Sequence, residues 1–364
     1  MLYPLDNPRL SFFQRLAEQP YPAKPEGLPV ADWAFELSLS PWVPLITGVV
    51  YLFATHATNH RFGPGKPKPA DLVKQSYGLS QTVLGHNILL AAYSGWTFFH
   101  AASRIIAYLF SGAATGGISG FTNAYCTVPI ADSSFAGLGI YVWLFYISKY
   151  YEIIDSVILI LKGKPVSNLQ SYHHAGAILC MWAAYRYSAP AVFIFLLFNS
   201  LVHTLMYTYY SMTALKLPFT GGLKRSMTTI QITQLVVGCG MAASYAFLTY
   251  NPSAYPAGAV PTPGRHIANP ASAAFSSFAS AGNNSSSNTA GSLLASNTKE
   301  AIQLIKNTLL SSVGAEGKTP CVSTSGQLFA VGLNVAYLIP LIYLFVSFYI
   351  RSYQKKQAKG AKSQ

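Results

Sequence analysis

Three histidines stand in residues 169–210, a stretch that is otherwise almost wholly apolar: His173, His174 and His203. Burying a polar side chain in apolar surroundings costs free energy unless a partner or a function compensates for it. A low-dielectric environment favours the uncharged imidazole, which can act as a nucleophile or as a general base. For any one histidine a hydrogen-bonded core role is the simpler interpretation, but for the set we expect a functional site.

Other polar side chains recur at helical spacing in the neighbouring apolar segments, so that members of each group share one helix face. The groups are Lys149, Glu152, Asp155 and Ser156; Gln170 with His173 and His174; Asn199, His203, Met206 and Tyr207; Thr228, Gln231 and Gln234; and His86 with Asn87. The alternative interpretation of the first group is structural: Lys149 and Glu152 form an ion pair within one helix and have no further function. Asn199, Gln231 and Tyr207 can donate hydrogen bonds to a developing oxyanion.

Clustered histidines also suggest a metal centre, as in membrane di-iron enzymes. The chain has 8 histidines, and His56, His60 and His266 fall in or beside predicted loops, which leaves few ligands. Glu152 and Asp155 could complete a ligand set, so the metal alternative stays open. We expect neither a metal nor another bound cofactor, and loss of activity on adding a chelator would contradict this.

The composition points to a membrane protein. The chain is 51% hydrophobic and only 10% charged, whereas a soluble domain carries about 25% charged residues. The net charge of +13 could suggest a nucleic-acid partner, but the long apolar segments argue against one and for the bilayer. Segments of the roughly 20 residues that cross a bilayer lie near 39–57, 80–110, 136–161, 168–187, 190–213, 227–249 and 327–350. We therefore predict an all-α polytopic membrane protein with seven transmembrane helices.

Seven spans place the two termini on opposite sides of the membrane, and the basic residues orient them. Most Lys and Arg fall in loops 58–79, 162–167 and 214–226 and in the C-terminal tail, whereas loop 111–135 has none. The positive-inside rule therefore predicts a luminal N-terminus and a cytosolic C-terminus. In that orientation most polar groups lie in the cytosolic halves of their helices, with His203 about 15 Å deep. We expect them to line a cavity that is open to the cytosol.

Two further features fall on the predicted luminal side. The first part of segment 250–326 is rich in Ser, Ala, Gly, Pro and Asn, as in a disordered insertion, and its sequons at Asn283 and Asn284 are either glycosylated or unmodified. Cys126 and Cys321 share this side, where disulfides persist, and we predict a bond between them. The predicted divisions are a luminal tail 1–38, a membrane domain 39–249, the insertion 250–326, a last helix 327–350 and a cytosolic tail 351–364.

Four ordered motifs resemble those of one enzyme family. KYYEIIDS is similar to the KxxExxD(T/S) box of the ELO fatty-acid elongases, YHHAGA to the core of their histidine box, NSLVHTLMYTYY to their NxxxHxxMYxYY box and TTIQITQ to their TxxQxxQ box. The resemblance covers roughly residues 40–250 and the last helix, and the wording is most similar to fungal-type members. It implies a very-long-chain 3-oxoacyl-CoA synthase of the endoplasmic reticulum membrane. Such an enzyme condenses acyl-CoA with malonyl-CoA to 3-ketoacyl-CoA, CoA and carbon dioxide.

The same resemblance implies six helices around an acyl-chain tunnel, and an acyl-enzyme formed on a box histidine. The implied catalytic residues are His173 as the nucleophile, His203 as its assistant in acyl transfer or malonyl decarboxylation, and His174. The implied orienting or substrate-binding residues are Asn199, Tyr207, Lys149, Glu152, Asp155, Gln170, Thr228, Gln231, Gln234, His86 and Asn87, with Lys224 and Arg225 for CoA phosphates. Expected partners are the two substrates, the reductases and the dehydratase of later steps, and a second copy in a homodimer.

One position departs from the family pattern, because Gln170 stands where the histidine box usually begins with His. Glutamine can orient a neighbouring imidazole but cannot take up a proton at neutral pH. In having glutamine at this position the chain resembles some elongases of polyunsaturated chains, which suggests that substrate class. The competing hypothesis is a seven-helix transporter or receptor that binds a lipid-like ligand without catalysis. A transporter usually has internal repeats, and none is evident in the sequence.

Overall fold

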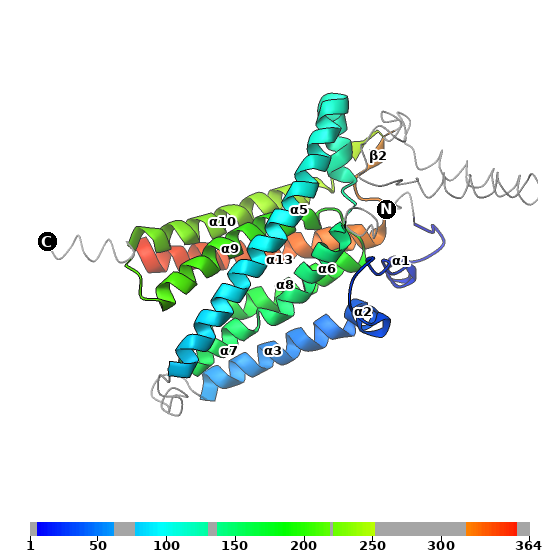
Figure 1. The fold of residues 1–364 in the computed structure, drawn as a ribbon. Coiled ribbons are helices and arrows are strands. Elements are labelled where there is room, and N and C mark those ends of the chain that lie inside the picture. Colours follow the sequence, from blue (N-terminus) through cyan, green and yellow to red (C-terminus); the bar gives the residue numbers. More distant parts are fainter. Residues whose placement is uncertain (1–5, 62–76, 130–136, 219–220, 252–317, 355–364) are drawn as a thin grey trace, which may run out of the picture.

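Helices dominate the computed structural model, which describes residues 6–61, 77–129, 137–218, 221–251 and 318–354. The elements are α1 (Phe12–Glu18), α2 (Asp32–Leu39), α3 (Trp42–Arg61), α5 (Tyr77–Cys126), α6 (Leu138–Tyr151), α7 (Ile154–Leu161), α8 (Asn168–Arg186), α9 (Val192–Ala214), α10 (Gly221–Ser244), β1 (Thr249–Tyr250), β2 (Thr319–Pro320), α13 (Ser325–Tyr349) and the π-helix η2 (Ile350–Gln354). The long helices form an elongated bundle, with the β-strands at one end of it (Figure 1). Within the described residues the fold is therefore all-α, apart from one two-stranded antiparallel sheet.

The prediction of a helical membrane protein is confirmed, whereas the number of crossings stays a prediction. Each of the predicted ranges contains at least one helix. By length and apolar composition, three described helices are candidate spans: Gly78–Cys126, Val192–Ala214 and Ser325–Tyr353. The bent pair of α2 and α3, which meet at 65°, adds a fourth if it counts as one span. Polar site residues lower the mean hydropathy of helices such as α8 and α10.

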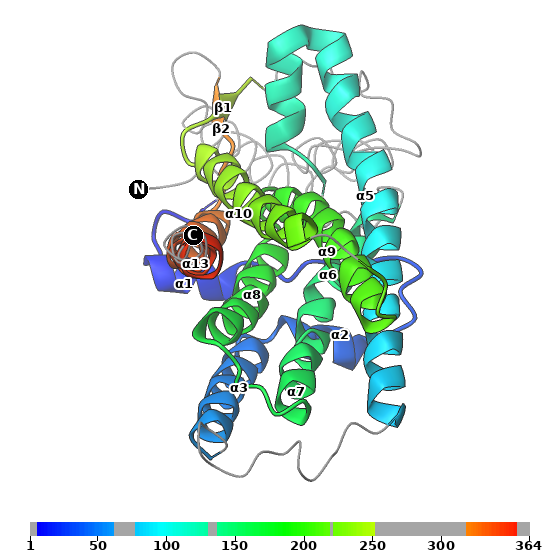
Figure 2. The same ribbon diagram turned by 90° about the vertical axis from the view of Figure 1, so that its left-hand side faces the viewer.

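α5 extends beyond its predicted range, because residues up to Cys126, which we expected in a loop, continue it as a helix. It turns back on itself at Gly116 and Gly117, whose φ/ψ values are non-helical, and Figure 2 shows this turn projecting beyond the bundle. Gly117 has a φ of 58°, a left-handed value that glycine adopts without strain. A Cβ on Gly112 would lie 2.6 Å from the carbonyl oxygen of Gly120. The close approach of the two arms therefore also requires glycine.

The N-terminal segment, predicted as a tail, packs against the same end of the bundle as the β-strands (Figure 1). α2 buries Phe35 and Leu39. The indole nitrogen of Trp182 donates to the carbonyl oxygen of Leu39 at 2.8 Å, and the hydroxyl of Tyr146 donates to that of Ser38 at 2.7 Å. Aromatic side chains from α6 and α8 thus satisfy main-chain groups at the end of α2 while they bury its apolar face.

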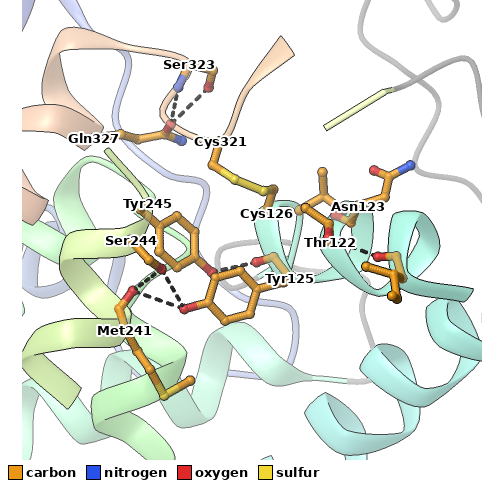
Figure 3. The surroundings of a disulfide bond; sticks show 12 residues. Thr122, Asn123, Tyr125, Cys126, Met241, Ser244, Tyr245, Cys321, Ser323 and Gln327 are labelled. Atoms are coloured by element: carbon orange, nitrogen blue, oxygen red, sulfur yellow. Dashed lines mark hydrogen bonds between the residues drawn. A yellow bond between two sulfur atoms is a disulfide. The ribbon is translucent and has the colours of Figure 1, made fainter. Parts of the chain in front are cut away.

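A disulfide bond between Cys126 and Cys321 joins the end of α5 to the segment after β2 (Figure 3). The main-chain nitrogen of Cys321 donates to the carbonyl oxygen of Leu248 at 3.0 Å. Beside the disulfide, the hydroxyl of Tyr245 donates to the carbonyl oxygen of Tyr125 at 2.5 Å, as Figure 3 shows. The segments that meet here are far apart in the chain, so the link greatly restricts the unfolded state.

The two other cysteines, Cys180 and Cys239, are free thiols in the helices of the bundle, Cys180 fully buried and Cys239 partly so. Most of the predicted insertion lies outside the described residues, and so do both sequons, Asn283 and Asn284. Use of these sequons therefore stays a prediction.

Candidate active site

A break between α6 and α7 lies beside two carboxylates predicted for the site. α6 ends at Tyr151 and α7 begins at Ile154, so that Glu152 lies at the break and Asp155 in the first turn of α7. The Glu152 side chain is only 3% exposed, whereas that of Asp155 is 19% exposed. The predicted range 136–161 therefore contains two shorter helices, and the polar groups of this region lie where they meet.

Glu152 is the centre of a buried charged cluster. The Lys149 ammonium donates to Glu152 Oε1 at 2.7 Å and to Asn199 Oδ1 at 2.8 Å. His203 Nδ1 lies 3.5 Å from Glu152 Oε1, and His174 Nδ1 lies 4.0 Å from Glu152 Oε2. A carboxylate is tolerated in a protein interior only when opposite charge and hydrogen bonds surround it. Lys149 therefore compensates the negative charge that Glu152 brings between two imidazoles.

Gln170 orients His174 at the start of α8. The Ser167 hydroxyl caps this helix by accepting a hydrogen bond from the main-chain nitrogen of Gln170 at 3.2 Å. The side-chain nitrogen of Gln170 lies 2.9 Å from His174 Nε2. An amide nitrogen only donates, so His174 Nε2 accepts and the proton of the neutral ring lies on Nδ1, toward Glu152. The contact matches the orienting role that we predict for Gln170.

His173 faces a small cavity of about 50 Å³ between α6, α8, α9, α10 and α13. Its wall is polar at His173, Lys149, Asn199 and Gln234. Most of the other wall residues are apolar: Phe145, Ala177, Met181, Phe195, Phe198, Leu235, Leu338 and Leu341. Such a wall suits a ligand that has both a polar reactive group and a hydrocarbon chain.

Asp155 belongs to a second cluster. His86 Nε2 lies 2.8 Å from Asp155 Oδ1, and the Tyr207 hydroxyl donates to Asp155 Oδ2 at 2.5 Å. The His86 ring stacks on Tyr151 with 5.5 Å between ring centroids, and the Tyr207 ring stands edge-on to His203, also at 5.5 Å. Tyr207 therefore links the two clusters, by a hydrogen bond to one and by ring packing to the other.

The polar residues predicted on α10 divide between the site and its surroundings. Gln234 lines the cavity, whereas the side-chain nitrogen of Gln231 donates to Met206 Sδ at 3.1 Å. The Thr228 hydroxyl donates to the carbonyl oxygen of Lys224, one turn earlier in the helix. Thr228 Oγ1 also lies 3.3 Å from the hydroxyl of Tyr353, so this residue links α10 to η2.

Three other predicted residues lie outside the cluster around Glu152. Lys224 and Arg225 are exposed in the first turn of α10, where Arg225 Nε donates to the hydroxyl of Tyr349 at 2.8 Å. They are not part of the histidine cluster, and about 15 Å of helix separates Lys224 from Gln234. Asn87 is buried on α5, next to His86.

The motifs miss two tyrosines that contact the site. The Tyr51 hydroxyl on α3 lies 2.7 Å from Ser156 Oγ, and its ring centroid lies 6.3 Å from that of His174. The Tyr337 hydroxyl on α13 lies 2.9 Å from His173 Nδ1. Both are polar groups in apolar segments, which is the signal that selected the histidines. The signal is weak for tyrosine because the chain has 24 of them.

The metal alternative has a geometric basis, since one ligand atom each from Glu152, His173 and His203 lie within 4.8 Å of one another. However, the Lys149 ammonium already donates to Glu152 Oε1. A metal ion beside that ammonium would be repelled by its like charge. These residues therefore fit an ammonium–carboxylate pair better than a metal, and the expected absence of a metal stays a prediction.

Comparisons with known proteins give a family and several relatives. The profile of the ELO family, described as the GNS1/SUR4 family, matches residues 36–361. Long chain fatty acid elongase 1 of Caenorhabditis elegans is 29% identical over 164 residues, which are 45% of this chain and 54% of that protein. Fatty acid elongase 2 of Trypanosoma brucei brucei is 29% identical over 182 residues, which are 47% of this chain and 65% of that protein. No solved structure gives a significant match.

The chain thus aligns with 54% and 65% of the length of these two relatives. The similarity to fungal-type members in particular stays a prediction. The family profile, in contrast, covers the bundle from α3 to α13, including every residue of both carboxylate clusters. The protein therefore belongs to the ELO (GNS1/SUR4) family.

Proposed function

We propose that the protein is a condensing enzyme of fatty-acid elongation, which joins a long-chain acyl-CoA to malonyl-CoA. The products are 3-ketoacyl-CoA, carbon dioxide and CoA. One observation carries the proposal: His173 opens onto a mainly apolar cavity beside the Lys149–Glu152 pair, which contacts His203. Relatives named as fatty acid elongases support the same reaction class.

The first step is transfer of the acyl group to His173. The imidazole attacks the thioester carbon, a C–N bond forms, the C–S bond breaks, and CoA leaves as a thiolate that solvent protonates. A buried imidazole is uncharged and therefore nucleophilic. The apolar side chains that line the cavity with His173 would hold the hydrocarbon chain during this step.

The second step uses malonyl-CoA. Loss of carbon dioxide leaves an enolate, whose carbon attacks the acyl carbon on His173; the C–N bond then breaks and the neutral imidazole returns. Asn199 Oδ1 accepts from Lys149, so the side-chain nitrogen of Asn199 is oriented to donate to a developing oxyanion. Glu152, 3.5 Å from His203 Nδ1, positions the second imidazole for the decarboxylation.

We place the protein in the endoplasmic reticulum membrane, with its N-terminus luminal and its C-terminus cytosolic. The disulfide between Cys126 and Cys321 supports this orientation, because disulfides persist in the oxidising lumen. Lys224 and Arg225 then lie on the cytosolic side. On this side the protein would bind CoA and contact the reductases and the dehydratase of the later steps. Elongation of polyunsaturated chains and a homodimeric state belong to the same proposal.

The experiment is condensation in microsomes from cells that express the full chain. Labelled malonyl-CoA is supplied with saturated, monounsaturated and polyunsaturated acyl-CoAs, and the labelled 3-ketoacyl product is measured. Microsomes that contain a His173→Ala, His203→Ala double variant at equal abundance give the background. We expect incorporation above this background for at least one acyl-CoA. No incorporation with any of them would refute the enzymatic function and favour a ligand-binding protein.

A further inference from the structure

Tyr337 contacts His173 at two atoms. Its hydroxyl lies 2.9 Å from His173 Nδ1, and it donates to the main-chain oxygen of His173 at 3.0 Å. Tyr337 is on α13, far along the chain from α8, and it belongs to none of the four motifs. Both residues line the cavity.

These two contacts select one tautomer of His173. A phenol has one proton and accepts through its oxygen. Because that proton goes to the main-chain oxygen of His173, the phenol oxygen can only accept from the imidazole. The proton of the neutral ring then lies on Nδ1, and the Nε2 lone pair remains for chemistry. Hydrogen bonding at one ring nitrogen commonly sets the role of the other in this way.

The residues next to His173 in α8 leave room for the ring of Tyr337. A Cβ on Gly176 would lie 2.2 Å from Cε2 of Tyr337, so the ring rests where α8 has no side chain. The Tyr172 ring stacks on Tyr337 with 5.5 Å between centroids, and its hydroxyl donates to the Tyr337 carbonyl oxygen at 3.2 Å. The glycine of the YHHAGA motif therefore has a physical role, which is to let α13 bring a hydroxyl to the imidazole.

We propose that Tyr337 is the positioning residue that directs Nε2 of His173 at the thioester, an inference that rests on the proposed function. In acyl transfer, Nε2 bonds to the thioester carbon while the C–S bond breaks and the thiolate of CoA leaves with the electron pair. The Nδ1 proton stays in its hydrogen bond to Tyr337, and the acyl-imidazolium carries the compensating positive charge. Condensation with the enolate then returns the neutral Nδ1–H imidazole.

The test compares Tyr337→Phe with Tyr172→Phe in the purified full-length protein. Each variant removes one hydroxyl from the same stacked pair, but only the first removes the imidazole partner. Rapid quenching after mixing with the best acyl-CoA, without malonyl-CoA, measures both the rate and the amplitude of acylation at His173. For Tyr337→Phe we expect a rate about 10-fold lower, as for loss of one hydrogen bond, with full amplitude. For Tyr172→Phe we expect a rate within about twofold of wild type.

The amplitude separates positioning from damage, because misfolded molecules lower the amplitude and leave the rate of the remainder unchanged. An unchanged acylation rate in Tyr337→Phe, or an equal fall in both variants, overturns the positioning role. So does a wild-type protein that condenses the substrates without acylating His173, and that result leaves the condensing function intact. Nitrogen NMR of labelled histidine gives a second test: the Nδ1–H tautomer should dominate in wild type and lose population in Tyr337→Phe.

Discussion

Glu152 and Asp155 are three residues apart, yet their carboxylates differ in burial and in the groups that contact them. Glu152 is almost completely buried, is bound to an ammonium, and lies beside His174 and His203. Asp155 is more exposed, has no cation of that kind among its described partners, and is held by His86 and a tyrosine hydroxyl. At the break between α6 and α7, the first carboxylate faces His174 and His203. The second faces His86 on α5 and Tyr207 on α9.

This difference indicates a division of labour. The Glu152 cluster shares Lys149 and Asn199 with the cavity wall, so changes there reach the reacting groups directly. Asp155 is instead linked to His203 through Tyr207, which donates to Asp155 and packs edge-on against the His203 ring. We therefore expect the Glu152 cluster to perform the chemistry and the Asp155 cluster to support it.

The largest effect should come from His173, which lines the cavity, and from His203, which lies beside Glu152. We expect His173→Ala and His203→Ala each to lower condensation by at least about 10³-fold, since each removes a nucleophile or proton-transfer group. Both proteins should still accumulate in the membrane, because neither change leaves a buried charge without its partner. Product formed per mole of purified protein is the measurement.

His100→Ala is the matched control, because His100 also lies in a membrane helix but stacks on Tyr141 away from both clusters. It should retain activity within about threefold. Normal turnover in either cluster variant would remove that histidine from the mechanism.

The second prediction concerns charge balance. Glu152→Gln leaves the Lys149 ammonium buried without its carboxylate, which should cost about 3–5 kcal/mol of folding free energy as well as activity. Adding Lys149→Met removes the unpaired charge, so the double variant should regain much of the lost thermal stability. Condensation should not return, because the oxyanion donors and His203 have lost their support. Thermal denaturation in detergent, with activity assayed in parallel, separates the two quantities.

A double variant no more stable than Glu152→Gln alone would show that the Lys149–Glu152 pair does not account for the instability. Recovery of activity together with stability would instead show that the pair is structural. That second outcome corresponds to the alternative in which the ion pair serves only itself.

The third prediction addresses Asp155. Asp155→Asn keeps the shape but weakens two charge-assisted hydrogen bonds, with an expected cost of about 1–3 kcal/mol. Turnover should fall by about 10-fold or less, since Tyr207 only packs on His203. If Asp155→Asn abolished condensation as completely as His203→Ala, the proposed division of labour would be wrong.

Much of the bundle could be predicted from the sequence, because apolar segments long enough to cross a bilayer mark where helices lie. The break at Glu152 could not, since residues 149–156 contain neither proline nor glycine. Glu152 and Ile153 keep right-handed helical φ and ψ values, so the interruption is slight. The turn in α5 has glycines at its centre, but the spacing of apolar residues does not show that the helix resumes after Gly116 and Gly117.

For the site, helical spacing grouped Lys149 with Glu152, and the four motifs brought in Asn199 and His203. Spacing cannot show contacts between helices far apart in the chain, so Tyr337 and Tyr51 were not foreseen. Nor could it show that Arg225 would bond to a tyrosine of α13. These contacts depend on how α8, α10 and α13 pack, which periodicity does not determine.

The smallest effect should come from the basic pair outside both clusters. Replacing Lys224 and Arg225 by Gln should raise the KM for acyl-CoA a few-fold and leave kcat unchanged, because exposed charges attract phosphates without touching the reacting atoms. The increase should shrink at high salt, where such attraction is screened beyond about 3 Å at 1 M. Lys164→Gln is the control, since Lys164 is exposed on the same predicted side but precedes α8. An equal rise in KM in the control would show that any surface charge on this side has the same effect. A fall in kcat in the Lys224 and Arg225 variant would show that the pair contacts the reacting groups, contrary to its place in the structure.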